Sequence, residues 1–252
     1  MELILVPGLW LDASSWDAVL PGLQAAGHHA RALTMPGTGA PAAESSSIGI
    51  ADWVAATVEA IDDAVDGTGG PVALVGHSGG GNVVWGAADA RPGQVSRVIF
   101  VDTVPPPPGA WISEFQVVDG VIPFPGWDFF PEAETSDIPG SDKERVAAAA
   151  LSVPERVPHE PISLSDERRY QIPVTVLSGA MDAEQLRTEL EQWGSFKDEA
   201  ERIDSFEVVR LGSGHWPQFS MPGRLAEAID EAVSGGSPVS NIETECPAGG
   251  LV

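Results

Sequence analysis

Residues 71–80, Pro-Val-Ala-Leu-Val-Gly-His-Ser-Gly-Gly, constrain the fold more than any other part of this chain. The apolar, β-branched run over 72–75 predicts a short buried strand, and the residues from Gly79 onward predict a helix. Ser78 therefore lies at a sharp turn between a strand and a helix. Such a turn requires small residues on both sides of the serine, and Gly76 and Gly80 meet that requirement.

The pattern Gly-x-Ser-x-Gly in this setting is typical of a nucleophilic serine. The amide of Gly79 can face negative charge that develops on a substrate, and a histidine can take the proton of the Ser78 hydroxyl. A chance loop rich in glycine and serine is the alternative interpretation. The flanking strand and helix favour the catalytic one, so we expect Ser78 to be the nucleophile.

Predicted strands and helices alternate along most of the chain. We expect strands over residues 3–6, 29–33, 72–75, 95–101, 172–178 and 206–211, and helices over 14–26, 50–65, 183–193 and 222–233 besides the helix after Ser78. This order predicts an α/β protein with a mostly parallel six-stranded sheet and helices on both faces. Sites in such proteins gather at the carboxyl ends of the strands.

The alternation stops between residues 105 and 170. Four consecutive prolines, 105–108, exclude a helix or a central strand there, and aromatic residues are frequent in this region. We expect an inserted lid over 105–170, a core formed by 1–104 and 171–233, and a flexible tail over 234–252. The lid aromatics, Trp111, Phe115 and Trp127 among them, either form a small core of the lid or line an apolar substrate pocket.

A nucleophilic serine needs a base, and the base needs a carboxylate that fixes its tautomer. His215 follows the last predicted strand in a glycine-rich loop, so its ring can reach Ser78 across the strand ends. Asp182 comes just after the preceding strand and is our candidate for the carboxylate. Asp102, at the end of the strand before the lid, is the alternative, although we expect it to cap a helix or to act indirectly.

Two backbone amides are needed to stabilise an oxyanion. We expect one from Gly79 and the other from Leu9, in the loop after the first strand. Trp10, His77 and Trp216 adjoin the predicted catalytic residues, and we assign them to the substrate pocket, although packing roles are equally consistent with the sequence.

Composition excludes several classes of partner. The formal net charge is −24, with 13 basic and 37 acidic residues, so the surface repels nucleic acid and anionic lipid. The single cysteine, Cys246, excludes an internal disulfide, and the sequence has no Cys/His cluster with the spacing of a metal site. The first residues lead directly into a predicted strand without a signal or a membrane span. We expect a cytoplasmic monomer or homodimer without metal or cofactor.

The chain resembles α/β-hydrolase fold proteins over residues 1–233, and within them the compact lidded group that includes plant-type methyl esterases and hydroxynitrile lyases. The marks of this resemblance are Gly8-x-Trp10, the segment 76–80, Asp182 after a strand, and Gly214-His215. The resemblance implies an α/β-hydrolase fold with a lid and a Ser-Asp-His order of catalytic residues.

Residue types then select among the reactions of this group. Epoxide hydrolases and haloalkane dehalogenases use an aspartate nucleophile, and the lyases carry a lysine beside the catalytic histidine, where this chain has Trp216. Ester, lactone or thioester hydrolysis through an acyl-enzyme is therefore the predicted reaction, on a small hydrophobic substrate. A cofactor-independent lyase or oxygenase, or a binding protein without turnover, is the alternative.

Overall fold

The computed structural model describes residues 1–235, so the predicted tail beyond Gly235 lies outside the described residues. A six-stranded sheet has the order β2-β1-β3-β4-β7-β8, and every neighbouring pair is parallel. The strands are β1 (Glu2–Val6), β2 (His29–Ala32), β3 (Val72–His77), β4 (Val95–Val101), β7 (Val174–Ser178) and β8 (Phe206–Arg210). The predicted fold class is thereby confirmed.

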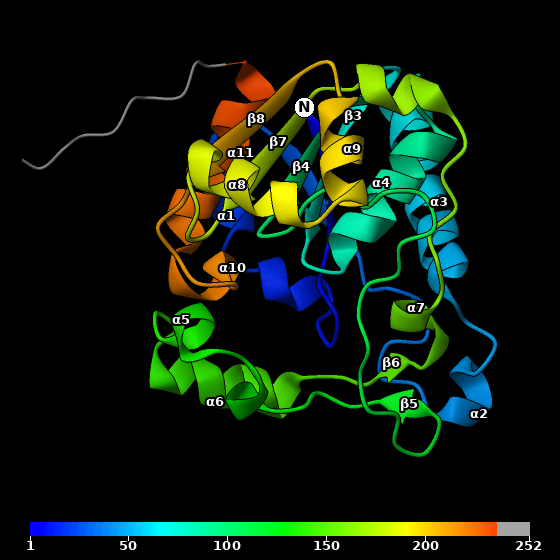
Figure 1. The fold of residues 1–252 in the computed structure, drawn as a ribbon, viewed down its shortest axis with the longest axis vertical. Coiled ribbons are helices and arrows are strands. Elements are labelled where there is room, and N and C mark those ends of the chain that lie inside the picture. Colours follow the sequence, from blue (N-terminus) through cyan, green and yellow to red (C-terminus); the bar gives the residue numbers. More distant parts are fainter. Residues whose placement is uncertain (236–252) are drawn as a thin grey trace, which may run out of the picture.

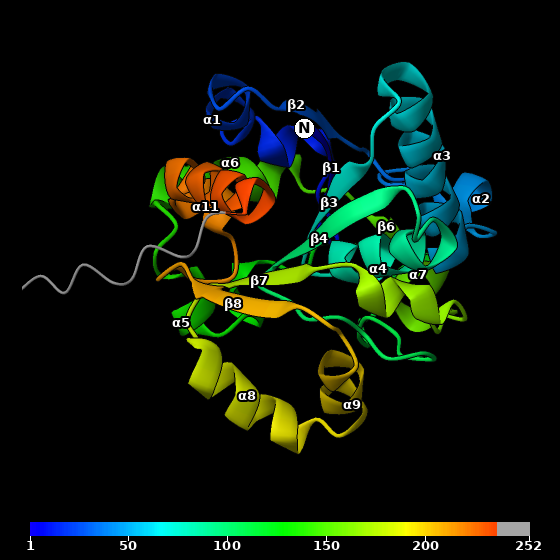
Figure 2. The same cartoon turned by 90° about the horizontal axis from the view of Figure 1, so that it is seen from above.

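Alternating side chains along the strands build a core on each face of the sheet, because successive residues of a strand point to opposite sides. Ile4, Leu74 and Phe100 pack on one face, and Leu5 and Val75 on the other. Helices α3 (Ile50–Thr68), α4 (Gly80–Ala90), α8 (Ala183–Gln192) and α9 (Ser195–Glu201) contribute to the first core, whereas α1 (Leu20–Ala25) and α11 (Pro222–Ser234) contribute to the second. Figure 2 shows α1 and α11 on the opposite side of the sheet from α3 and α4.

The prediction of one continuous helix over residues 14–26 is wrong, because two separate helical elements occupy this region. The structure has a short 3-10 helix, η1 (Ala13–Trp16), followed by α1, which begins at Leu20. Proline has no backbone N–H to donate and is tolerated only in the first turn of a helix. Pro21 therefore lies at the start of α1 rather than inside a longer helix. The other predicted helices and strands match observed elements, with small differences at their ends.

Residues 105–170, which we call the lid segment, contain short elements that lie outside the main sheet. Strands β5 (Val121–Ile122) and β6 (Val153–Pro154) form an antiparallel pair. The helical elements are η2 (Trp127–Phe129), α5 (Glu132–Thr135), α6 (Gly140–Ala149), α7 (Arg156–His159) and the start of η3 (Glu167–Gln171). Figure 1 shows α5, α6, β5 and β6 beyond one end of the sheet, together with α2 (Ala42–Ser45) and α10 (Pro217–Ser220).

Helix length and hydropathy indicate whether a helix could cross a membrane. Within residues 1–235, no helix has the length and mean hydropathy that a bilayer-spanning segment requires.

Candidate active site

The turn between β3 and α4 holds Ser78 in a conformation that side chains rarely adopt, with φ of 51°. The surrounding contacts explain the two glycines. A Cβ on Gly76 would lie 2.6 Å from the carbonyl oxygen of Gly80, and a Cβ on Gly80 would lie 2.6 Å from the carbonyl oxygen of Pro7. Both contacts involve backbone, which cannot rotate away. The glycines therefore let the strand, the helix and the loop after β1 approach one another around Ser78.

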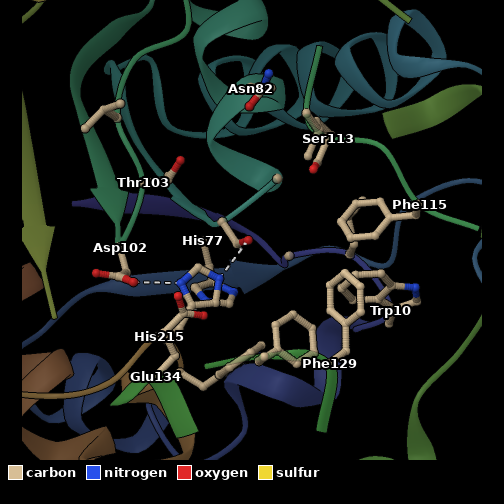
Figure 3. Close-up of a pocket in the computed structure, with 18 of the residues that line it drawn as sticks. Trp10, His77, Asn82, Asp102, Thr103, Ser113, Phe115, Phe129, Glu134 and His215 are labelled. Carbon is tan, nitrogen blue, oxygen red and sulfur yellow. Dashed lines mark hydrogen bonds and ion pairs between the residues drawn. The ribbon is translucent and has the colours of Figure 1, made fainter. Parts of the chain in front are cut away.

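Three side chains far apart in the sequence form one hydrogen-bonded chain. Nε2 of His215 is 2.9 Å from Oγ of Ser78, and Nδ1 of His215 is 2.6 Å from Oδ2 of Asp102 (Figure 3). A carboxylate only accepts hydrogen bonds, so Nδ1 carries the proton and Nε2 accepts from the hydroxyl. The sequence prediction that His215 reaches Ser78 agrees with this geometry.

Asp102 is held as an anion in a largely buried position. Burial by itself opposes ionisation, but the hydrogen bond from His215 and its electrostatic attraction, together with the Gly179 amide, outweigh it and lower the pKa of Asp102 below its ordinary value. The Gly179 amide donates to Oδ1 at 2.7 Å. Because each oxygen of Asp102 has its own donor, the carboxylate has a fixed orientation toward His215.

Asp182, the predicted partner of His215, lies elsewhere, and that prediction is wrong. Its exposed carboxylate caps the start of α8, where Oδ1 accepts from the amides of Glu184 at 3.0 Å and Gln185 at 2.9 Å. The side chain of Gln185 accepts in turn from the Asp182 amide. This reciprocal capping box is visible in the sequence as Asp followed three residues later by Gln. The capping role that we expected for Asp102 is thus the role of Asp182.

His77 holds the backbone of residues 211–216, the loop between β8 and α10 that carries His215 and that we call the histidine loop. The ring is buried, and its Nε2 donates to the carbonyl oxygen of His215 at 2.8 Å, while Nδ1 accepts from the side-chain Nε2 of Gln218 at 3.2 Å. Burial, reinforced by the nearby His215, lowers the pKa of His77 to about 3. His77 is therefore a neutral group that positions His215 through the hydrogen bond to its backbone carbonyl.

The lid segment holds the same loop from the other side. The amide of His215 donates to the carbonyl oxygen of Glu134 at 2.9 Å, and the amide of Gly214 donates to Oδ2 of Asp137 at 2.8 Å. A Cβ on Gly214 would lie only 2.2 Å from the Glu134 carbonyl oxygen. The loop that carries His215 is therefore fixed between His77 and the lid segment.

Ser78 and His215 open into a cavity of about 380 Å³, which we call the first cavity. Its walls are mainly aromatic and aliphatic. The predicted residues Leu9, Trp10, His77, Gly79, Trp111, Phe115 and Trp216 all line it. The sequence prediction did not single out Ile112, Phe129, Phe130, Phe196, Asn82 or Glu134, which also line it. Phe129 and Phe130 belong to the group of aromatic residues in the lid segment, and this high local aromatic content is the sequence feature that could have pointed to them.

Trp127, in contrast, does not line the first cavity, so its assignment to the pocket is wrong. Its ring packs edge to face on Trp216, with ring centroids 5.1 Å apart, and its Nε1 donates to the carbonyl oxygen of Lys143. Trp127 belongs to a small core between the lid segment and the histidine loop, together with Ile138 and Val146. Spacing along the chain cannot separate this packing role from a pocket role.

Two amides near Ser78 have no acceptor within residues 1–235. Neither the Leu9 nor the Gly79 amide donates to another group of the described protein, although both residues line the first cavity. Uncommitted backbone donors that face a cavity are suited to a ligand oxygen. This agrees with the pair of donors expected from the sequence.

Comparison with known proteins identifies the family of the chain. Residues 3–228 match the family described as "Alpha/beta hydrolase family". The chain is 36% identical over 103 residues to Esterase PIR7B of Oryza sativa subsp. japonica, a match that covers 41% of this chain and 38% of that protein. It is 29% identical over 147 residues to Probable esterase PIR7A of Oryza sativa subsp. indica, covering 57% and 54%. The matches thus cover about half of the length of these curated relatives, or less.

Solved structures share the fold over nearly the whole chain. The methylesterase MES16 from Arabidopsis superposes with a TM-score of 0.74 at 21% identity, covering 93% of this chain and 99% of that chain. A pyrethroid hydrolase from Sphingobium faniae JZ-2 superposes with a TM-score of 0.68 at 24% identity, covering 93% and 98%. At these identities the likeness shows the fold.

Proposed function

Since this chain belongs to the alpha/beta hydrolase family, we propose that it hydrolyses carboxylic esters of small hydrophobic substrates, with Ser78 as the nucleophile. The observation that carries the proposal is the hydrogen-bonded chain from Asp102 through His215 to Ser78 at the edge of a cavity with mainly aromatic and aliphatic walls. The relatives named as esterases, and the solved methylesterase and pyrethroid hydrolase, support the same class of reaction. Lactones and thioesters present a similar carbonyl group.

Acylation starts with the Ser78 hydroxyl. Its oxygen attacks the carbonyl carbon while its proton moves to Nε2 of His215, and the Asp102 carboxylate stabilises the imidazolium that forms. His215 then gives this proton to the oxygen of the leaving alcohol, and the C–O bond of the ester breaks. An acyl group remains bound to Ser78.

The developing oxyanion is stabilised by the amides of Leu9 and Gly79, each of which contributes roughly 10²- to 10³-fold in rate. Water then enters, His215 takes a proton from it, and the resulting hydroxide attacks the acyl-enzyme. Expulsion of the Ser78 oxygen, which recovers the proton from His215, releases the carboxylic acid. The acyl group has room in the part of the first cavity that Trp10 and Phe115 line.

Replacement of the nucleophile tests the reaction. Ser78→Ala should lower kcat on p-nitrophenyl esters by roughly 10⁴- to 10⁶-fold, because no acyl-enzyme can form. Ser113→Ala is the matched control: this serine lines the same cavity and makes no hydrogen bond to a histidine within residues 1–235, so its removal should change kcat by only a few fold. Circular dichroism establishes that both variants are folded.

Covalent labelling separates ester hydrolysis from the alternative of a cofactor-independent lyase. A fluorophosphonate should modify Ser78 in the wild-type protein, as seen by mass spectrometry of the labelled peptide, because the probe reacts only with an activated hydroxyl. Wild-type turnover in Ser78→Ala, or an unlabelled Ser78 in the active protein, would contradict the proposal.

A further inference from the structure

A second cavity, of about 590 Å³, adjoins the first one. Its wall includes residues of β7, α8, α9 and the loops beside α8, namely Val176, Met181, Leu186, Trp193 and Phe196. The two cavities have in common Asp102, Thr103, Val104, Glu134, Phe196 and His215. These shared residues place the second cavity directly beside the first one, next to His215.

The second cavity lies on one particular side of the catalytic residues. His215 and Asp102 line it, whereas Ser78, Leu9 and Gly79 do not. Figure 3 shows Asp102 and Thr103 on the opposite side of His215 from Trp10, Phe115 and Phe129. The second cavity therefore lies beyond His215, on the side away from Trp10, Phe115 and Phe129.

This position indicates which part of an ester it would receive. When the carbonyl carbon is at Ser78 and its oxygen faces the amides of Leu9 and Gly79, the leaving oxygen must be next to Nε2 of His215, which protonates it. The chain attached to the leaving oxygen then points past His215. The acyl chain has the space beside Trp10 and Phe115.

We propose that the second cavity binds the alcohol part of the substrate, so that this protein selects esters with a bulky, uncharged, apolar alcohol. The inference rests on the proposed function. The aliphatic and aromatic wall supplies the attraction for such a group. Asp102 and Glu134, both acidic, also line this cavity. Repulsion between like charges therefore disfavours an alcohol part that carries a negatively charged group.

Two series of esters test the assignment. In the first the acid is acetate and the alcohol grows from methyl to benzyl, and in the second the alcohol is methyl and the acid grows from acetate to phenylacetate. For the wild-type protein we expect kcat/KM to be at least about tenfold higher for benzyl than for methyl acetate, because one well-buried apolar group is worth that much in selectivity. Met181→Trp, which fills the second cavity, should bring this ratio close to one.

Matched measurements keep the test specific. Met181→Trp should leave the ratio of methyl phenylacetate to methyl acetate as in the wild type, since the acyl side is unchanged. Glu191→Trp adds the same ring to an exposed position of α8 and should leave both ratios unchanged. Trp193→Ala removes a wall of the second cavity whose ring is 43% exposed, so the fold should persist, and the benzyl ratio should fall several fold.

The outcomes separate the inference from the function on which it rests. A flat alcohol series in a wild-type protein that cleaves methyl esters would overturn the inference alone. The inference would also be overturned if Met181→Trp changed only the ratio of methyl phenylacetate to methyl acetate. The second cavity would then bind the acyl part instead of the alcohol part. Absence of any ester turnover, with Ser78 unlabelled by fluorophosphonate, would overturn the proposed function and the inference together.

Discussion

Both ends of the hydrogen-bonded chain Asp102–His215–Ser78 have a left-handed backbone conformation that is costly for a residue with a side chain. Ser78 has φ of 51° and Asp102 has φ of 46°, and each lies directly after a strand, β3 or β4. A residue in this region of φ and ψ costs about 1–3 kcal/mol, so the surrounding contacts must compensate for it. Here the compensation includes hydrogen bonds from the Ser78 amide to Val101 and from the Asp102 amide to Leu177.

The two candidate carboxylates can be compared directly by matched substitutions. Asp102→Asn should lower kcat roughly 10⁴-fold. Its side-chain oxygen would remain on the Gly179 amide, so its NH₂ would face Nδ1 of His215 and move the ring proton to Nε2, where it blocks the serine. Asp182→Asn should leave kcat unchanged, because asparagine caps a helix as well as aspartate does. Ester kinetics in which the Asp182 variant is the impaired one would restore the sequence-based assignment.

The buried His77 predicts a pH dependence of stability. Its folded pKa of about 3 is below the ordinary value of 6.5, so the unfolded chain takes up a proton that the folded chain does not. The stability contributed by neutral His77 is complete above about pH 6.5 and declines as the pH falls toward 3. One such group lowers the free energy of unfolding by about 2 kcal/mol between pH 8 and pH 5.

Denaturant unfolding of a His77→Gln variant measures this contribution. The loss of stability between pH 8 and pH 5 should be smaller in His77→Gln than in the wild type by about 2 kcal/mol. His29→Gln is the comparison: it removes an imidazole whose side chain is 82% exposed and contacts Glu2, so it measures how far the loss of a surface histidine alone changes the pH dependence. Equal pH dependence in wild type and His77→Gln would contradict a neutral, buried ring at position 77.

At the scale of elements, the histidine loop and α5 form one unit. The His215 amide donates a hydrogen bond to the Glu134 carbonyl, and the backbone of Glu134 is so close to Gly214 that no side chain fits between them. Movement of the lid segment near α5 would therefore move His215 relative to Ser78. The lid segment acts on the chemistry through the backbone, besides supplying aromatic walls.

Gly214→Ala tests this coupling. The added Cβ would meet the Glu134 carbonyl at 2.2 Å, so either α5 or His215 must shift. Because a displacement of about 1 Å can cost 10²-fold in rate, we expect kcat to fall by about that factor with the fold retained. Gly223→Ala is the control, since its Cβ would meet nothing within 4 Å. Kinetics with short esters, with circular dichroism of both variants, decide the outcome, and an unimpaired Gly214→Ala enzyme would refute the coupling.

At the scale of the whole molecule, a buried ionic cluster connects three elements on one face of the sheet. Arg169 of η3 contacts Asp89 of α4 at 3.1 Å and Glu199 of α9 at 3.1 Å, and both Arg169 and Glu199 are 2% exposed. Tyr170 donates to Glu199, and burial together with this carboxylate raises the pKa of Tyr170 to about 12. The cluster fixes α9, whose Phe196 lines both cavities.

Removal of the central cation should destabilise the protein strongly. Arg169→Met leaves two carboxylates buried without their partner, a change that costs about 3–5 kcal/mol of the free energy of unfolding. Arg224→Met breaks pairs with Glu227 and Glu231 at the surface and should cost at most about 1 kcal/mol. Denaturant unfolding of both variants at one pH measures the difference, and similar losses would contradict a structural role for the cluster.

Local patterns in the sequence determined the strands, the turn at Ser78 and the loop of His215. Continuous apolar runs such as residues 72–75 specify strands that are buried on both faces, and glycines on both sides of Ser78 specify the close approach of strand and helix. These signals are short in range. They depend on residues that are neighbours along the chain, so they can be read without the tertiary structure.

Only the tertiary structure decided which aspartate contacts His215 and which aromatic side chains line the cavities. Asp102 and Asp182 both follow a strand, but β4 lies between β3 and β7 in the sheet, so Asp102 ends beside Ser78. Asp182 lies four residues beyond the end of β7, where it caps α8. Sheet order and the packing of Trp127 on Trp216 depend on contacts between distant segments, which no local pattern encodes.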